Sequence, residues 1–168
     1  FSLDNYTVIM SISSGYFLIS SFKLNRIIDA FIRAMIFFSL YSLLATYIFL
    51  PLNLEGRLNI FKIYYNNDRP FVDMIFAMCL KYRGIPRNSG FCREPGVYQF
   101  YLLMAVLFSL KCISSKKKLI ACEIIFFITM ISTFSSIMYI TLPICIVLLF
   151  MRLTKSPIDL LKNIMILL

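Results

Sequence analysis

The sequence predicts an all-α, polytopic integral membrane protein with about five transmembrane helices, and three observations support this fold class. Hydrophobic residues fill 60% of the 168 positions and charged residues only 15%, against about 25% charged residues in soluble domains. The apolar residues collect in runs close to the roughly 20 residues that a membrane helix needs. The 17 Lys and Arg residues outnumber the 8 Asp and Glu residues and lie between these runs. We therefore expect a lipid bilayer as partner, and no nucleic acid.

The first two predicted spans, near 5–22 and 34–52, form a helical hairpin with a basic turn. Pro51 lies at the end of the second span, where its ring opposes further helix. Asp29 and Arg33 are four residues apart just before that span. An i,i+4 ion pair at the membrane surface is the favoured interpretation of these two residues, and an ion pathway is the alternative.

A long external loop, 53–96, follows the second span. Its apolar patch, 71–80, contains Asp73 and is too short to cross a bilayer, so it predicts a short helix that lies on the membrane interface or re-enters the membrane partway. Two of the five cysteines, Cys79 and Cys92, could meet outside the cytoplasm, and a disulfide between them is the less favoured alternative.

The rest of the chain predicts three more spans. The stretch 119–151 has a single charge, Glu123, and one helix of that length would be about 50 Å long and overshoot the bilayer. A turn at 132–136 (STFSS) divides it, since hydroxyl side chains can satisfy backbone groups there. We expect Glu123 to reach the interface; a functional acid within the membrane is the alternative. The predicted spans lie near 97–114, 117–133 and 137–152.

The basic residues support this layout. Five spans put two crossings between each pair of neighbouring basic clusters, so all the clusters share the cytoplasmic side and the long loop faces outward. The clusters are Lys23, Arg26 and Arg33; Lys116, Lys117 and Lys118; and Arg152 and Lys155. The sequence has no histidine and no CxxC pair, so we expect no metal and no cofactor.

The external loop is itself basic, most densely over 81–96 (KYRGIPRNSGFCREPG). Glycines and prolines make helix improbable there and favour a tightly turned segment whose backbone can approach a ligand. The planar fork of arginine matches phosphate oxygens two at a time. A phosphate ligand and a solvated loop touching anionic lipid headgroups both remain open at this point.

The segment RNSGFCREPGVYQFYLLMAVL resembles the signature of O-antigen polymerases and the related O-antigen ligase-like membrane proteins. In that family an external Arg-x-x-Gly-x-x-x-Glu-Pro-Gly stretch leads into an apolar span. The TFSS turn at 133–136 is similar to a Thr-x-Ser turn in the same family, and the resemblance covers roughly 80–152. The matching signature residues are Arg87, Gly90, Glu94, Pro95 and Gly96, followed by Gln99.

This resemblance implies a glycosyltransferase that polymerises or transfers undecaprenyl-pyrophosphate-linked oligosaccharide repeat units in O-antigen, capsule or exopolysaccharide synthesis. It implies a multi-pass protein of the bacterial cytoplasmic (inner) membrane whose active loop lies on the periplasmic or outer face. The implied partners are the lipid-linked glycan and a chain-length regulator protein. The family has more spans and a second arginine-bearing loop, and this chain opens with Phe1, so we expect a fragment of a longer protein.

The resemblance also assigns roles to residues. Arg87 would stabilise the negative charge that develops on the departing pyrophosphate, with Arg83 or Arg93 as a second contact. Glu94 would act as catalytic base or simply orient the arginines. Gln99 would hydrogen-bond a sugar or a neighbouring helix, and Gly90 would let the backbone approach the substrate.

Two other functions compete with the enzyme. A lipid-linked oligosaccharide transporter or flippase would bind the same pyrophosphate without making a bond, and a non-catalytic membrane subunit would bind no ligand. A transporter is expected to place ionised residues along its spans. In this sequence they collect in one external loop, which favours the glycosyltransferase.

Overall fold

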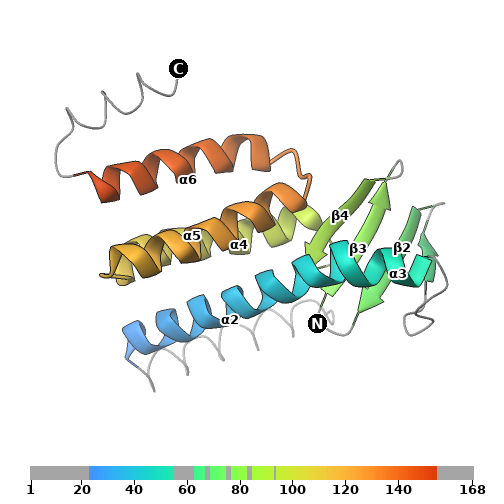
Figure 1. The fold of residues 1–168 in the computed structure, drawn as a ribbon, viewed down its shortest axis with the longest axis horizontal. Coiled ribbons are helices and arrows are strands. Elements are labelled where there is room, and N and C mark those ends of the chain that lie inside the picture. Colours follow the sequence, from blue (N-terminus) through green and yellow to red (C-terminus); the bar gives the residue numbers. More distant parts are fainter. Residues whose placement is uncertain are drawn as a thin grey trace, which may run out of the picture.

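The protein is mostly helical, with a small β-sheet at one end of the helices (Figure 1). The computed structural model describes residues 23–54, 63–66, 69–74, 77–82, 85–92 and 94–154. The predicted span near 5–22 lies outside the described residues, as do Arg83, Arg93 and Lys155.

The first described helix is longer than predicted. It runs without a break through α2 (Leu24–Leu44), the π-helical turn η1 (Ala45–Phe49) and α3 (Leu50–Leu54). The predicted basic turn is therefore wrong over Leu24–Arg33, which is already helical. The i,i+4 pair is confirmed, since Arg33 Nη2 lies 2.8 Å from Asp29 Oδ2 on an exposed face. Pro51 has no N–H to donate to the preceding turn, and the wider π-helical turn lies just before it.

The other three described helices begin and end close to their predicted positions. They are α4 (Pro95–Cys112), α5 (Lys116–Ser132) and α6 (Met138–Leu153). Pro95 is the first residue of α4, where its missing N–H has no intrahelical partner to lose. The predicted turn after Ser132 is confirmed. It includes Phe134 at φ 44°, and the amide of Phe134 donates to the carbonyl of Ile131 at 3.2 Å.

The external loop contains a four-stranded antiparallel sheet, so the predicted interfacial helix at 71–80 is wrong and the all-α class needs this correction. The strands pair in chain order as a meander. Phe71 pairs with Leu80 and Val72 with Cys79, so the apolar patch is divided between two neighbouring strands. The strands are β1 (Ile63–Asn66), β2 (Arg69–Met74), β3 (Ala77–Tyr82) and β4 (Ile85–Gly90).

Aromatic and β-branched residues favour strand over helix in β1 and β2. β1 and β2 carry Ile63, Tyr64, Tyr65, Phe71 and Val72, residue types that fit a pleated, partly buried surface.

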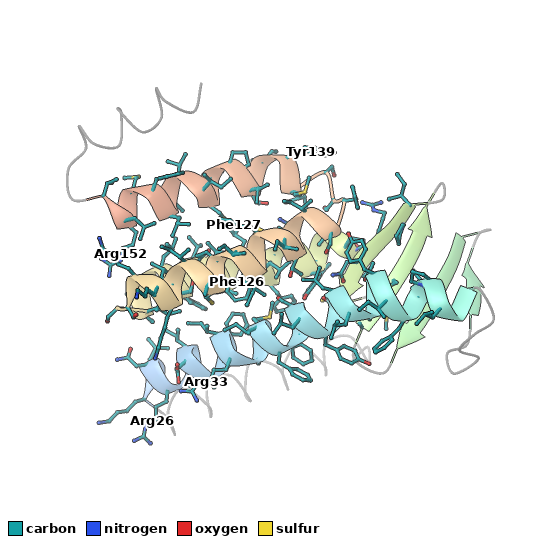
Figure 2. The ribbon with its side chains drawn as sticks, in the orientation of Figure 1. Arg26, Arg33, Phe126, Phe127, Tyr139 and Arg152 are labelled. Atoms are coloured by element: carbon teal, nitrogen blue, oxygen red, sulfur yellow. The ribbon has the colours of Figure 1, made fainter. Side chains whose placement is uncertain are left out.

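The main hydrophobic core lies between α2, α4 and α5, and α6 packs on α4 and α5. Phe126, at the centre of α5, is fully buried, and Phe127 beside it packs against the same core (Figure 2). Phe31 of α2 meets Phe108 of α4 edge-on, with ring centroids 5.7 Å apart.

Basic residues cluster at one end of the helices. Arg26, Arg33 and Arg152 lie at the end away from the sheet (Figure 2). At that end Lys116 Nζ donates to the carbonyl of Leu153 at 3.3 Å, and Arg152 Nε donates to the carbonyl of Leu110 at 3.2 Å. The described basic clusters therefore share one end of the molecule.

Candidate functional site

Buried polar side chains gather where the sheet meets the helices. We call this group the junction cluster. Its members come from α2, β4, α4, α5, α6 and the turn between α5 and α6, and each is buried. They are Ser42, Asn88, Gln99, Ser132, Thr133 and Thr141.

Arg87 connects β4 to the C-terminal end of α5. Its Nε donates to the carbonyl of Thr133 at 3.4 Å, and its Nη2 donates to the carbonyl of Phe134 at 2.5 Å. The last carbonyls of a helix have no intrahelical partner and carry partial negative charge, so a guanidinium there is favourable. Arg87 is half-buried, and its fork holds the turn at 133–136.

Asn88 ties three elements together from a fully buried position. Its Nδ2 donates to Ser42 Oγ of α2 at 3.0 Å and to Ser132 Oγ of α5 at 2.9 Å. Its Oδ1 accepts from the amide of Gly90 at 2.8 Å. Both polar atoms of the side-chain amide are satisfied, which a buried amide requires.

Gly90 has a backbone conformation and a neighbour that both favour glycine. Its φ is +55°, in the left-handed region. A Cβ there would lie 2.4 Å from Tyr98 Cζ, so the space of a side chain is filled by the tyrosine ring. The Tyr98 hydroxyl in turn lies 3.2 Å from Ser42 Oγ. Gly90 is expected to let the backbone approach a substrate. In this structure the group that lies close to the Gly90 backbone is the Tyr98 ring.

Gln99 bridges α4 to α6 and the turn before it. Its Nε2 donates to Thr141 Oγ1 at 2.8 Å, and its Oε1 accepts from Thr133 Oγ1 at 3.1 Å. Of the two partners considered for Gln99, a sugar or a neighbouring helix, the structure shows the neighbouring helix.

Glu94 lies on the surface directly before α4. Its side chain caps no helix N–H, while its backbone carbonyl accepts from the amide of Tyr98 at 3.2 Å. The structure thus brings Arg87, Gly90 and Gln99 to one junction, with Glu94 exposed at the start of the helix that carries Gln99.

The two cysteines of the external segment are free, as are the other three in the chain. Burial raises the pKa of the Cys79 thiol to about 11, although the hydrogen bond with Thr46 lowers it in part. Burial also raises the pKa of the Cys92 thiol to about 11. Both thiols are therefore protonated at neutral pH and are poor nucleophiles.

Sequence reasoning missed several partners of the predicted residues. Asn88 lies inside the resembling segment and Ser132 inside the predicted turn, so both positions carried a signal. Ser42 and Thr141 lie within apolar runs and carried none, because only the packing of the helices brings them to Asn88 and Gln99.

Glu123 does not reach the interface, and that prediction is wrong. The residue is fully buried, and its Oε1 is in hydrogen-bond contact with Ser109 Oγ of α4. The helix turns Glu123 toward α4, so its distance from the basic end in sequence does not give it access to water. Among the described residues, no group of three or more His, Cys, Asp and Glu side chains could hold a metal ion.

Comparison of the chain with models of known protein families, with curated proteins and with solved structures finds no match. The arrangement itself is therefore what bears on function: a half-buried guanidinium beside a satisfied polar cluster, and an exposed carboxylate directly before α4.

Proposed function

We propose that this chain is part of a membrane glycosyltransferase resembling the O-antigen polymerases, acting on lipid-linked oligosaccharide at the sheet end of the helices. One observation carries the proposal. The two segments that hold the resemblance, around Arg87 and around Thr133, are 46 residues apart and are joined by a direct hydrogen bond. A second bond joins Gln99 to Thr133.

The distribution of polar residues supports insertion of the helices in a membrane. Large apolar side chains face outward, including Tyr139 and Ile140 of α6 at 71% and 68% exposure, while Ser, Thr, Asn and Gln side chains pair inside. Helices in lipid associate through such interhelical hydrogen bonds. Among the described residues, two helices are long and apolar enough to span a bilayer, Leu24–Leu52 and Pro95–Cys112, and Met138–Leu153 is a shorter apolar helix.

The charge distribution supports the orientation. The end with Arg26, Arg33 and Arg152 would face the cytoplasm, since basic residues are retained on that side. The sheet and the junction cluster would then face the periplasm or outer face of the bacterial cytoplasmic membrane. Arg87 would lie on that face, close to the ends of α4 and α5.

The chemistry that we propose for Arg87 is stabilisation of the leaving diphosphate. When the anomeric carbon leaves an undecaprenyl pyrophosphate, negative charge grows on the departing oxygens, and a fixed cation stabilises that charge more than the ground state. The bonds of Arg87 to the turn hold its guanidinium in a defined position before substrate arrives. Glu94 would accept the proton of the attacking sugar hydroxyl or orient the arginines, and Arg83 or Arg93 would supply a second phosphate contact.

One observation favours the alternative of a lipid-linked oligosaccharide transporter. Glu123 is a fully buried acid within the helices, the kind of residue that ion-coupled transporters use. It lies on the α4–α5 contact beside Ser109 rather than at the junction cluster.

The proposal is tested in the full-length parent protein with Arg87→Ala and Arg87→Lys, using Arg26→Ala at the opposite end as control. Loss of Arg87 should shorten the polysaccharide to single repeat units on a gel, while the control keeps full-length polymer. Lysine should not rescue, because an ammonium cannot make the two bonds of a guanidinium fork. Full-length polymer from both Arg87 variants at normal protein levels would refute the role of Arg87.

Two further outcomes separate the alternatives. A transporter defect would leave no repeat unit on the outer acceptor, whereas a polymerase defect leaves one. Labelling of a cysteine placed at position 87 by a membrane-impermeant thiol reagent should occur from the outer face, and cytosolic labelling would overturn the proposal.

A further inference from the structure

The contact between α4 and α5 contains a carboxyl group that the proposed glycosyl transfer does not use. Glu123 of α5 is fully buried, and Ser109 of α4, also fully buried, lies against its Oε1. The remaining oxygen, Oε2, has no hydrogen-bond partner among the described residues.

The contacts of Ser109 bear on whether Glu123 carries a proton. Ser109 Oγ lies 2.8 Å from the carbonyl oxygen of Val106, and it also contacts Glu123 Oε1. A serine hydroxyl has one hydrogen, and a carbonyl oxygen can only accept. Both contacts can be hydrogen bonds at the same time only if Ser109 donates to Val106 and Glu123 carries a hydrogen that it donates to Ser109 Oγ.

The surroundings of Glu123 point to the same protonation state. The titratable groups beside it are the thiols of Cys122 on α5 and Cys145 on α6. The cations at the basic end, Lys111, Lys116, Lys117, Lys118 and Arg152, have exposed side chains, and none forms an ion pair with Glu123. An ionised carboxylate with an unpaired oxygen in an apolar core is costly, whereas a neutral acid is tolerated.

We infer that Glu123 is a proton-binding site: a neutral carboxylic acid that donates its hydrogen to Ser109 Oγ, which donates its own to the carbonyl of Val106. The bonded proton joins α5 to α4 at the middle of the helical core. The site takes a proton as its ligand and is independent of the junction cluster and of the glycosyl transfer proposed above.

The experiment is infrared difference spectroscopy of the reconstituted full chain at neutral pH. The carbonyl stretch of a protonated carboxylic acid should be present in the wild type and absent in Glu123→Gln. The control, Asp29→Asn, removes an exposed carboxylate paired with Arg33 and should leave that band unchanged. Two results would overturn the inference. One is a protonated-acid band that survives in Glu123→Gln, and the other is a difference spectrum in which the substitution removes only carboxylate bands.

Ser109→Ala gives an independent readout if Glu123→Gln fails to fold. Removing the acceptor of the Glu123 hydrogen should move the protonated-acid band to higher frequency without abolishing it. A band that does not move on this substitution would also overturn the inference. Neither measurement depends on polysaccharide synthesis, so its failure is distinguishable from failure of the proposed enzyme.

Discussion

Gly90 packs so closely against Tyr98 that a Cβ atom on Gly90 would lie 2.4 Å from Cζ of the tyrosine ring. This contact joins the end of β4 to the first turn of α4. Because Gly90 also has φ +55°, two independent features at one residue favour glycine.

Gly90→Ala should therefore destabilise the protein by at least about 2 kcal/mol, since left-handed strain and overpacking each cost roughly 1–3 kcal/mol. Thermal unfolding in detergent measures the effect. Gly96→Ala is the matched control: a Cβ there would meet Ile137 Cδ1 at 3.5 Å, an ordinary contact. Equal stability of the two variants would contradict the packing described here.

Substitution of Arg87 should weaken the attachment of the sheet to α5. Arg87→Lys keeps the positive charge but cannot reproduce two directed bonds to the Thr133 and Phe134 carbonyls. We expect a loss of about 1–2 kcal/mol for both Lys and Ala, since bonds from charged groups contribute about 1.5–3 kcal/mol and this side chain is half-exposed. Unfolding midpoints of these variants, with Arg26→Ala as control, check the prediction; an unchanged midpoint would contradict it.

Asn88 and Ser132 should be energetically coupled. A double-mutant cycle with Asn88→Ala and Ser132→Ala should give an interaction free energy of about 0.5–3 kcal/mol, as for residues in one hydrogen-bond network. Asn88→Ala combined with Thr141→Ala is the comparison pair, because Thr141 bonds to Gln99 instead. Strict additivity in the first cycle would show that the Asn88–Ser132 bond contributes nothing.

The cysteines should differ in reactivity toward a membrane-permeant maleimide. Cys112 is exposed and should label first, whereas Cys79 is buried and Cys92 is half-buried. Because both of the latter have a pKa of about 11, their thiolate fraction at neutral pH is low and their labelling should accelerate as pH rises toward that value.

Mass spectrometry of labelled peptides, with and without reductant, checks both points. The extent of labelling at Cys79 and Cys92 should not depend on reductant, because all five thiols are free. Rapid labelling of Cys79 at neutral pH would contradict its burial in the sheet.

The junction cluster was only partly predictable. The segment from Arg87 to Gln99 and the turn at Thr133 were each identified as functional candidates, but nothing in the sequence indicated that Arg87 donates to that turn. The partner in each of these hydrogen bonds lies in another element, and its position depends on how α2, α5 and β4 pack.

The same distinction separates Asp29 from Glu123. Asp29 and Arg33 lie four residues apart on one helix, so their ion pair followed from helical geometry alone. The partner of Glu123 is on a different helix, and only the rotation of α5 against α4 decides whether the carboxyl meets water or Ser109.

The ends of α4, α5 and α6 follow from local features of the chain, because the apolar runs, Pro95, the three lysines and the STFSS turn each act over a short stretch of sequence. The basic cluster at the end away from the sheet (Figure 2) follows from the same local spacing of apolar runs and basic residues. The β-sheet and the buried polar bonds depend instead on tertiary packing. Strand pairing and interhelical hydrogen bonds join residues that are distant in sequence. They stabilise the fold only when the partner element is already packed in place.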